Sequence, residues 1–171
     1  MRTELQTNLE FLTTFFSQPD NALMEQIRLG ETPLGTVEKS DTEFSFADEK
    51  MVLISELFIN SKNERPIFPL ATEYFDEKKE KEEFIENLIL LYESHNKVVT
   101  NYPPDHIKVL LEFVLFNLSQ NDITGLKDFY TIFLKPWYNR FSESIKSRSN
   151  DSLAVQLTAL IQKTMIHIES L

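Results

Sequence analysis

The chain has 171 residues, a formal net charge of −10 at pH 7 and no cysteine. This length fits one domain, residues 1–171, and the lack of cysteine excludes disulfides, thiolate metal sites and cysteine nucleophiles. The acidic balance argues against nucleic acid as a partner, because proteins that bind it usually present a basic face. The sequence has no long uncharged apolar run, so we expect no membrane insertion and a cytoplasmic location.

Apolar residues recur at intervals of three and four along nearly the whole chain, which is typical of amphipathic helices. The first apolar stripe predicts a helix over 5–16. A second, short helix is expected over about 21–29, followed by a surface loop over 31–44 that is rich in turn-forming residues. Helical spacing resumes over 47–59 and gives way to a linker over 60–66.

The second half of the chain continues the helical pattern. Its most charged segment, 76–83, mixes both signs and predicts a solvated helix start with ion pairs between residues four apart. Further helices are expected over about 104–119, from the turn at 120–122 to about 135, over 137–146 and over 152–170. The sequence shows neither strand alternation nor an internal repeat, so it predicts an all-α, single-domain bundle of roughly eight helical segments.

The segment 102–107, with the sequence Tyr-Pro-Pro-Asp-His-Ile, is the most informative part of the chain. Proline fixes φ and lacks a backbone N–H, so it is tolerated in the first helical turn but stops a helix that precedes it. We therefore expect a helix to begin at about Pro104. Asp105 would complement the positive end of the helix dipole, whereas a protonated His106 would not. Because local electrostatics does not favour His106 there, it is a candidate functional residue.

Catalytic and metal sites have little support in the sequence. The three histidines, His95, His106 and His167, lack metal-ligand spacing, and no Gly-x-Ser-x-Gly elbow provides a serine nucleophile. Asp105 and His106 are adjacent, but neighbouring helical side chains point about 100° apart and do not hold each other as catalytic pairs must. The few glycines are too far apart to form a phosphate-binding loop. We expect no cofactor, no metal ion and no enzymatic activity.

An aromatic run over 129–141 allows two interpretations, a core or a binding groove. Most of its rings recur at helical spacing, which favours the core. Trp137 is the exception, because a ring that follows a helix break often lines a concavity. Four carboxylates are further candidates for a binding role, although scattered carboxylates usually face solvent: Glu73, Asp76, Asp105 and Glu112.

Three regions of the sequence resemble, in the same order, the redox-enzyme maturation chaperones of the TorD, DmsD and NarJ type. Pro-Pro-Asp-His-Ile at 103–107, followed by Leu-Glu-Phe at 111–113, is similar to the central motif of that family. Glu-Leu-Phe at 56–58, followed by Pro-Leu-Ala-Thr-Glu-Tyr at 69–74, is similar to its Tyr-x-x-Leu-Phe and Pro-x-Glu-Ser-Val-Tyr segments. The aromatic run over 129–141 resembles its Phe-Leu-x-x-His-Leu-x-x-Trp-x-x-x-Phe segment.

The resemblance implies an all-helical cytoplasmic chaperone. Such a protein would bind the twin-arginine signal peptide and the body of a molybdopterin oxidoreductase subunit, and hold it for molybdenum-cofactor insertion before export or assembly. The expected peptide-binding residues are Asp105, His106, Glu73, Tyr74, Glu112 and Trp137. A helical adaptor or regulator with an unrelated protein partner and a small helical enzyme built around Asp105 and His106 remain alternatives. A monomer and a domain-swapped dimer are both compatible with the sequence.

Overall fold

A computed structural model of the chain describes residues 3–17, 26, 29, 31–34, 57–58, 67–97, 101–148 and 152–171. In these residues the regular structure is helical apart from one isolated β-bridge, which confirms the all-α prediction. The elements are α1 (Glu4–Phe16), the 3-10 helix η2 (Ala71–Tyr74), α4 (Lys78–Ser94), α5 (Ile107–Ser119), α6 (Ile123–Phe129), the π-helix η3 (Tyr130–Leu134), α7 (Tyr138–Arg148) and α8 (Ser152–Glu169).

The number of helices can be compared with the prediction only over the described residues. The described residues contain six α-helices, rather than the roughly eight helical segments expected from the apolar pattern. The helices predicted over 21–29 and 47–59 lie mostly outside the described residues, and the linker over 60–66 lies wholly outside them. Of the predicted loop over 31–44, only 31–34 are described.

Helix α1 forms where the first apolar stripe predicts it. Thr3 Oγ1 accepts a hydrogen bond from the Gln6 N–H at 3.2 Å, and Gln6 Oε1 accepts one from the Thr3 N–H at 3.0 Å. This reciprocal capping box satisfies two backbone donors that the helix itself leaves unpaired. The predicted stripe is buried at every position: Leu5, Leu9, Leu12, Phe15 and Phe16.

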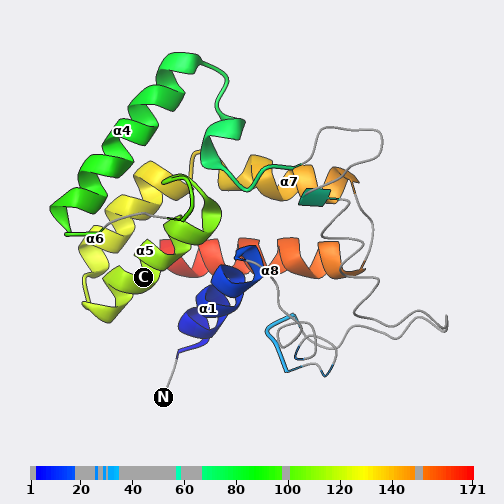
Figure 1. The fold of residues 1–171 in the computed structure, drawn as a ribbon. Helices are drawn as coiled ribbons and strands as arrows, with labels where there is room; N and C mark the ends of the chain where they lie inside the picture. The colour runs from blue at the N-terminus through cyan, green and yellow to red at the C-terminus, as the bar shows by residue number, and fades with distance from the viewer. Residues whose placement is uncertain are drawn as a thin grey trace.

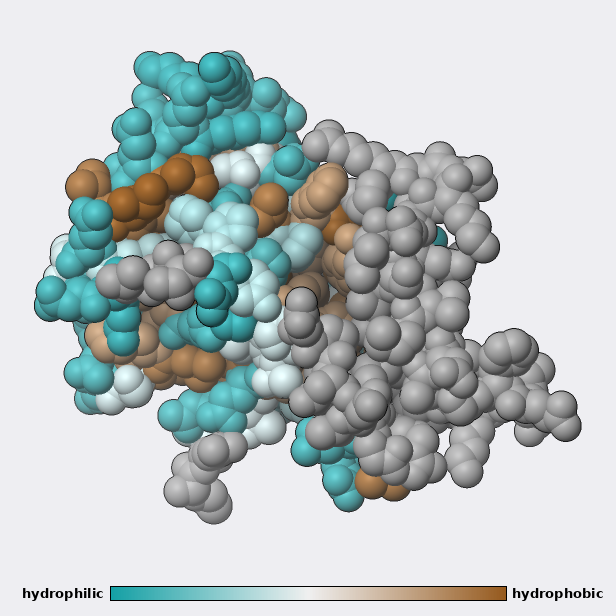
Figure 2. Space-filling model, viewed as in Figure 1, coloured by the Kyte–Doolittle hydropathy of each residue, from teal (hydrophilic) through white to brown (hydrophobic). Residues whose placement is uncertain are grey.

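The charged segment at the start of α4 behaves as the sequence predicts. Lys78 and Lys79 each lie 3.4 Å from a carboxylate four residues on, in Glu82 and Glu83, and all four side chains are exposed. Figure 2 shows hydrophilic residues gathered over the upper end of the molecule, where α4 begins in Figure 1. The opposite stripe of α4 is buried and ends at Tyr92.

Helix α5 has buried residues along most of its length. It packs against α1 and α6, while α7 and α8 run side by side across the molecule and α1 also contacts α8 (Figure 1). The 3-10 helix η2 contacts both α4 and α7, so it lies at the junction of the outer helices. None of the helices in the described part of the chain combines the length and the apolar character needed to cross a membrane.

Candidate functional site

The sequence predicts that a helix begins at about Pro104, within the Pro-Pro-Asp-His segment. In the structure α5 begins only at Ile107. Asp105 precedes the helix and turns its side chain toward η2. Its Oδ2 accepts hydrogen bonds from the Thr72 N–H at 3.0 Å and from Thr72 Oγ1 at 2.6 Å. Only 3% of Asp105 is exposed, so these donors replace the water that a buried carboxylate would otherwise need. Hydrogen bonding across the fold, rather than the helix dipole, fixes this carboxylate.

Backbone pairing reinforces the same contact. The Ala71 N–H donates to the Asp105 carbonyl at 3.0 Å, and the Ile107 N–H donates to the Pro69 carbonyl at 2.9 Å. Leu70 and His106 form an antiparallel β-bridge between these two bonds. We call residues 69–72 and 105–107, joined in this way, the clasp. It ties the start of α5 to η2 through both backbone and side-chain hydrogen bonds.

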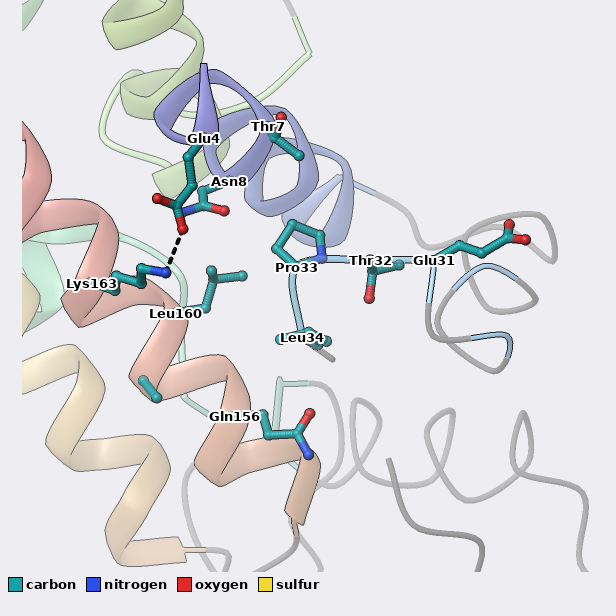
Figure 3. A pocket seen from close by; sticks show the side chains of 11 residues that line it. Glu4, Thr7, Asn8, Glu31, Thr32, Pro33, Leu34, Gln156, Leu160 and Lys163 are labelled. Carbon is teal, nitrogen blue, oxygen red and sulfur yellow. Dashed lines mark hydrogen bonds and ion pairs between the residues drawn. The ribbon is translucent and has the colours of Figure 1, made fainter. Parts of the chain in front are cut away.

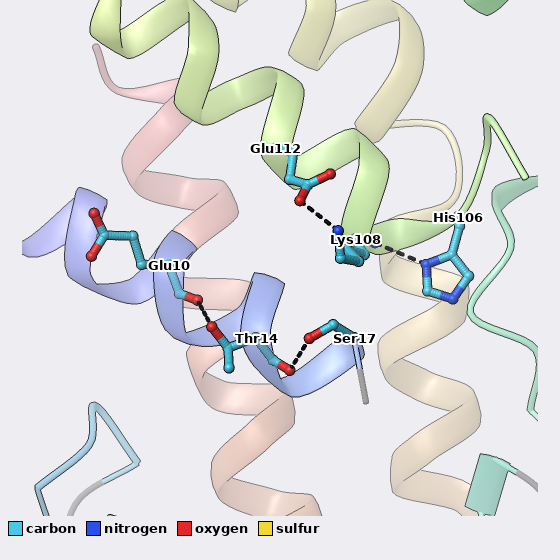
Figure 4. A network of polar contacts seen from close by, with 6 residues as sticks. All are labelled: Glu10, Thr14, Ser17, His106, Lys108 and Glu112. Carbon is cyan, nitrogen blue, oxygen red and sulfur yellow. Dashed lines mark hydrogen bonds and ion pairs between the residues drawn. The ribbon is translucent and has the colours of Figure 1, made fainter. Parts of the chain in front are cut away.

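His106 is the N-cap of α5, and its Nδ1 accepts a hydrogen bond from the Lys108 N–H at 3.2 Å (Figure 4). An N-cap accepts from the first turn, so a neutral imidazole serves the same purpose as a serine or asparagine side chain. Burial lowers the His106 pKa, against the opposing effect of the Asp105 charge. The predicted electrostatic mismatch is therefore resolved, because the structure favours the neutral ring.

Aromatic and hydroxyl groups cover the clasp from two sides. The Tyr102 ring lies 4.7 Å from the His106 ring, centroid to centroid. Tyr92, near the end of α4, donates its hydroxyl to the Pro104 carbonyl at 3.1 Å. Burial, and then the Asp105 charge, raise the pKa of Tyr92, so its hydroxyl remains a donor at neutral pH. These contacts link α4 to the turn that precedes α5.

Trp137 lies in the core and not on the surface around the clasp. Its side chain is fully buried, and its Nε1 donates to the Phe133 carbonyl at 2.6 Å. Tyr74 of η2 stacks over it with ring centroids 6.1 Å apart. The prediction that Trp137 lines a concavity is therefore wrong for this structure, and the core interpretation applies to it as to its neighbours. The helix break at Pro136 turns the indole inward, where its N–H finds a carbonyl one turn away.

Tyr74 is half-buried and connects the core to the surface. Its hydroxyl donates to the Phe68 carbonyl at 3.3 Å, and burial raises its pKa to about 12. Arg140 of α7 donates to the Tyr74 carbonyl at 2.7 Å and lies 3.3 Å from Asp76 Oδ2. Arg140 thereby holds the end of η2 against α7.

The exposed carboxylates near the clasp come from both of its sides. Glu73 lies in η2 and is exposed. Glu112 lies in α5, half-exposed, with Lys108 Nζ 2.5 Å from its Oε1 (Figure 4). Lys108 also lies 5.0 Å from the Tyr102 ring centroid. The clasp thus fixes the two elements that carry Glu73 and Glu112 relative to one another.

Sequence reasoning found Asp105 and His106 but missed their partners. Thr72 and Tyr92 were not candidates, because a threonine or tyrosine at helical spacing carries no signal of a contact with a distant segment. The 33 residues between Thr72 and Asp105 hide the pairing from any local pattern. Among the described residues no hydrogen bond joins the Asp105 and His106 side chains. No group of three or more metal-ligating side chains gathers within that part of the chain.

The structure shows an all-helical protein in which the turn before α5 is held against η2. The buried Asp105 carboxylate in this turn is hydrogen-bonded to Thr72. The chain belongs to the nitrate reductase delta subunit family, which matches residues 54–143. This is the NarJ/TorD-type family of chaperones for molybdoenzyme maturation, so the resemblance seen in the sequence is confirmed. The matched region includes the clasp and every predicted site residue. No curated protein matches the chain.

Proposed function

We propose that this chain is a cytoplasmic chaperone that binds the twin-arginine signal peptide of a molybdenum-cofactor oxidoreductase subunit. It holds the subunit while the cofactor is inserted and then releases it for export or assembly. Family membership supports the role in molybdoenzyme maturation. The proposal that the chain binds the signal peptide is supported by the residues of the candidate site around the clasp.

The observation that carries this proposal is the position of two carboxylates on the two sides of the clasp. Glu73 on η2 and Glu112 on α5 are accessible, whereas Asp105 is buried and holds η2 through Thr72. A guanidinium pairs with a carboxylate in a planar, two-pronged geometry, which favours arginine over lysine. Glu73 and Glu112 therefore serve as the arginine receptors, and the clasp holds their elements in place.

Magnitudes indicate how the two parts of a signal peptide contribute. An exposed ion pair contributes only about 0–1 kcal/mol, so two such pairs give orientation more than affinity. Three or four apolar side chains of the peptide, at about 1.5–3 kcal/mol each, supply more. Ordering the peptide removes several kcal/mol of this gain, which leaves a dissociation constant of about micromolar. The arginine pair sets register, and the apolar stretch supplies most of the binding energy.

Titration calorimetry with synthetic peptides tests the proposal. One peptide carries an Arg-Arg pair followed by an apolar stretch, and a second differs only in having Lys-Lys. We expect the arginine peptide to bind several-fold more tightly, and the difference to shrink in a Glu73→Gln/Glu112→Gln variant. A Glu80→Gln/Glu86→Gln variant is the matched control, because it makes the same change in charge on exposed positions of α4.

The absence of heat at high micromolar peptide would end the proposal. Equal loss of binding in the α4 control variant would show that net charge, and not the placement of carboxylates beside the clasp, attracts the peptide.

A further inference from the structure

The ion pair between Lys108 and Glu112 of α5 differs from the other lysine–carboxylate pairs in its burial. Only 17% of the Lys108 side chain is exposed, whereas 54% to 88% of the lysine side chain is exposed in the other four such pairs among the described residues. The Lys163–Glu4 pair, beside the pocket of Figure 3, has the same Nζ–Oε1 distance of 2.5 Å, but both of its side chains are exposed. Water and salt compete less for a shielded ammonium, so Lys108 holds its carboxylate more firmly than a surface lysine does.

The Lys108 ammonium also has a second neighbour. Its Nζ lies over the Tyr102 ring, 5.0 Å from the centroid, which is within the distance at which a cation is attracted to an aromatic face. The Tyr102 ring in turn lies against the His106 ring, beside the clasp. The ammonium is therefore held between a carboxylate and a ring, and it keeps the ring as a neighbour if the carboxylate is taken by another cation.

This ion pair occupies a carboxylate that the proposed function assigns to an arginine of the peptide. Lys108 Nζ contacts Glu112 Oε1, and Glu112 is half-exposed, so an incoming cation can reach its carboxylate from solvent (Figure 4). A guanidinium forms two parallel hydrogen bonds with a carboxylate, whereas an ammonium acts as a point charge without that geometry. An arginine is therefore suited to displace Lys108 from Glu112.

We propose that Lys108 is an internal counter-ion that competes with the arginine of the peptide for Glu112. This inference rests on the proposed function and adds a residue that regulates the affinity of the same site. In the free chain Lys108 neutralises Glu112. In the complex the arginine takes the carboxylate, and Lys108 remains over the Tyr102 ring. One ion pair replaces another, so the exchange lowers the affinity and favours release of the peptide.

Such an exchange has a signature in the salt dependence of binding. Salt screens the attraction between a peptide cation and an unpaired carboxylate, but it has less effect where a counter-ion already brings the local net charge to zero. Removing the Lys108 charge should therefore raise the affinity for the peptide and make that affinity fall more steeply as salt is added. A residue that only supports the helix would change stability without changing this slope.

Titration calorimetry with the Arg-Arg peptide tests the inference. Lys108→Met keeps an apolar side chain of similar length, and the backbone N–H that donates to His106 is retained. We expect its peptide affinity to rise at least about threefold at low salt. Between about 0.02 M and about 0.3 M salt, that affinity should fall more steeply than in the parent chain. Lys108→Arg keeps a cation beside Glu112 and should retain the salt dependence of the parent chain.

Lys79→Met is the matched control. It removes the same charge from another ion pair between residues four apart, on α4, so the net charge of the chain changes equally. Its peptide affinity and salt dependence should remain close to those of the parent chain. Melting temperatures establish that each variant is folded, and Lys108→Gln gives the same comparison if Lys108→Met does not fold.

The outcomes separate this inference from the proposed function. If the parent chain binds the peptide but Lys108→Met has the same affinity and salt dependence, only the inference is overturned. Equal gains in Lys108→Met and Lys79→Met would also overturn it, because net charge would then account for both. Weaker binding by Lys108→Met would show that Lys108 supports the site instead of competing for Glu112. The absence of binding in the parent chain and in every variant would end the proposed function, and the inference with it.

Discussion

Thr72 and Asp105 are separated by 33 residues, yet Asp105 Oδ2 accepts hydrogen bonds from both the backbone N–H and the hydroxyl of Thr72. This pair joins η2 to the turn before α5 and leaves almost none of the carboxylate exposed. The arrangement explains how an acidic residue is accommodated in the buried turn before α5. It also distinguishes the buried carboxylate that organises the site from the exposed carboxylates of Glu73 and Glu112.

The Thr72–Asp105 contact should be measurable as a coupling energy. Thr72→Val removes the hydroxyl donor to a charged acceptor, and we expect a loss of about 1.5–3 kcal/mol in the free energy of unfolding. With Asp105→Asn in a double-mutant cycle, the coupling should be about 0.5–3 kcal/mol. Urea denaturation measures each variant. Thr131→Val removes an exposed hydroxyl that donates to the Lys127 carbonyl four residues earlier, and it should change stability by less than about 0.5 kcal/mol.

His106 should make stability fall in mildly acidic solution. Its folded-state pKa lies below the ordinary value of 6.5, so the unfolded chain takes up a proton at higher pH than the folded chain does. Between the two pKa values the unfolded state binds more protons, and stability falls as the pH decreases through that window. His106→Asn keeps an N-cap acceptor without this titration. Denaturation between pH 7 and 5 should show a smaller loss for this variant, and an identical loss would contradict the account.

His106→Ala tests the capping hydrogen bond of His106 separately from the protonation of its ring. It removes the acceptor for the Lys108 N–H, and N-cap replacement by alanine costs about 0.5–2 kcal/mol. We expect that loss at pH 7, where His106→Asn should lose much less. Thermal denaturation followed by circular dichroism measures both variants. Equal destabilisation by Asn and Ala would show that ring packing against Tyr102, and not capping, is the contribution of His106.

Much of the fold follows from local sequence patterns. The α1 stripe and the charged start of α4 are confirmed, because a buried face and a solvated helix start depend on residues three and four apart. The start of α5 was predicted too early. Proline geometry permits a helix from Pro104, but pairing with 69–72 supplies better hydrogen bonds for the backbone of that turn. No local pattern contains that information.

In the candidate site, too, some features follow from local sequence and others depend on distant segments. His106 was singled out because it fits a helix start poorly, and Asp105 as its acidic neighbour in the same motif, and the structure gives each a specific partner. Trp137 was assigned to a surface because it follows a break, yet the break directs it inward onto the Phe133 carbonyl. Whether a ring after Pro136 faces core or solvent depends on η2, which packs over it from a distant part of the sequence.

Trp137 is the only tryptophan of the chain and so reports on the core without interference. Its emission should be blue-shifted and weakly quenched by acrylamide in the folded state. Trp137→Ala should lower the free energy of unfolding by about 3–5 kcal/mol, because it leaves a large cavity and removes a buried ring. Chemical denaturation followed by circular dichroism measures this loss. Strong quenching in the folded chain would instead place the indole at the surface.

Tyr92→Phe should weaken the link between α4 and the turn before α5. The substitution keeps the ring, which lies 5.2 Å from that of Phe113, but removes the hydrogen bond to the Pro104 carbonyl. We expect a loss of about 0.5–1.5 kcal/mol in the free energy of unfolding. Urea denaturation measures it, with Tyr102→Phe as the tyrosine control. If both substitutions were neutral, the Tyr92 hydroxyl would contribute nothing to the clasp.

The most direct test of the proposed chaperone role is to map the binding site of a twin-arginine peptide by backbone NMR shifts. The account predicts that the largest shifts lie at Glu73, Tyr74, Glu112 and the clasp, and that a Lys-Lys peptide reduces them. Largest shifts on the outer face of α4, or on α1 and α8, would contradict it, as would shifts that do not distinguish the two peptides.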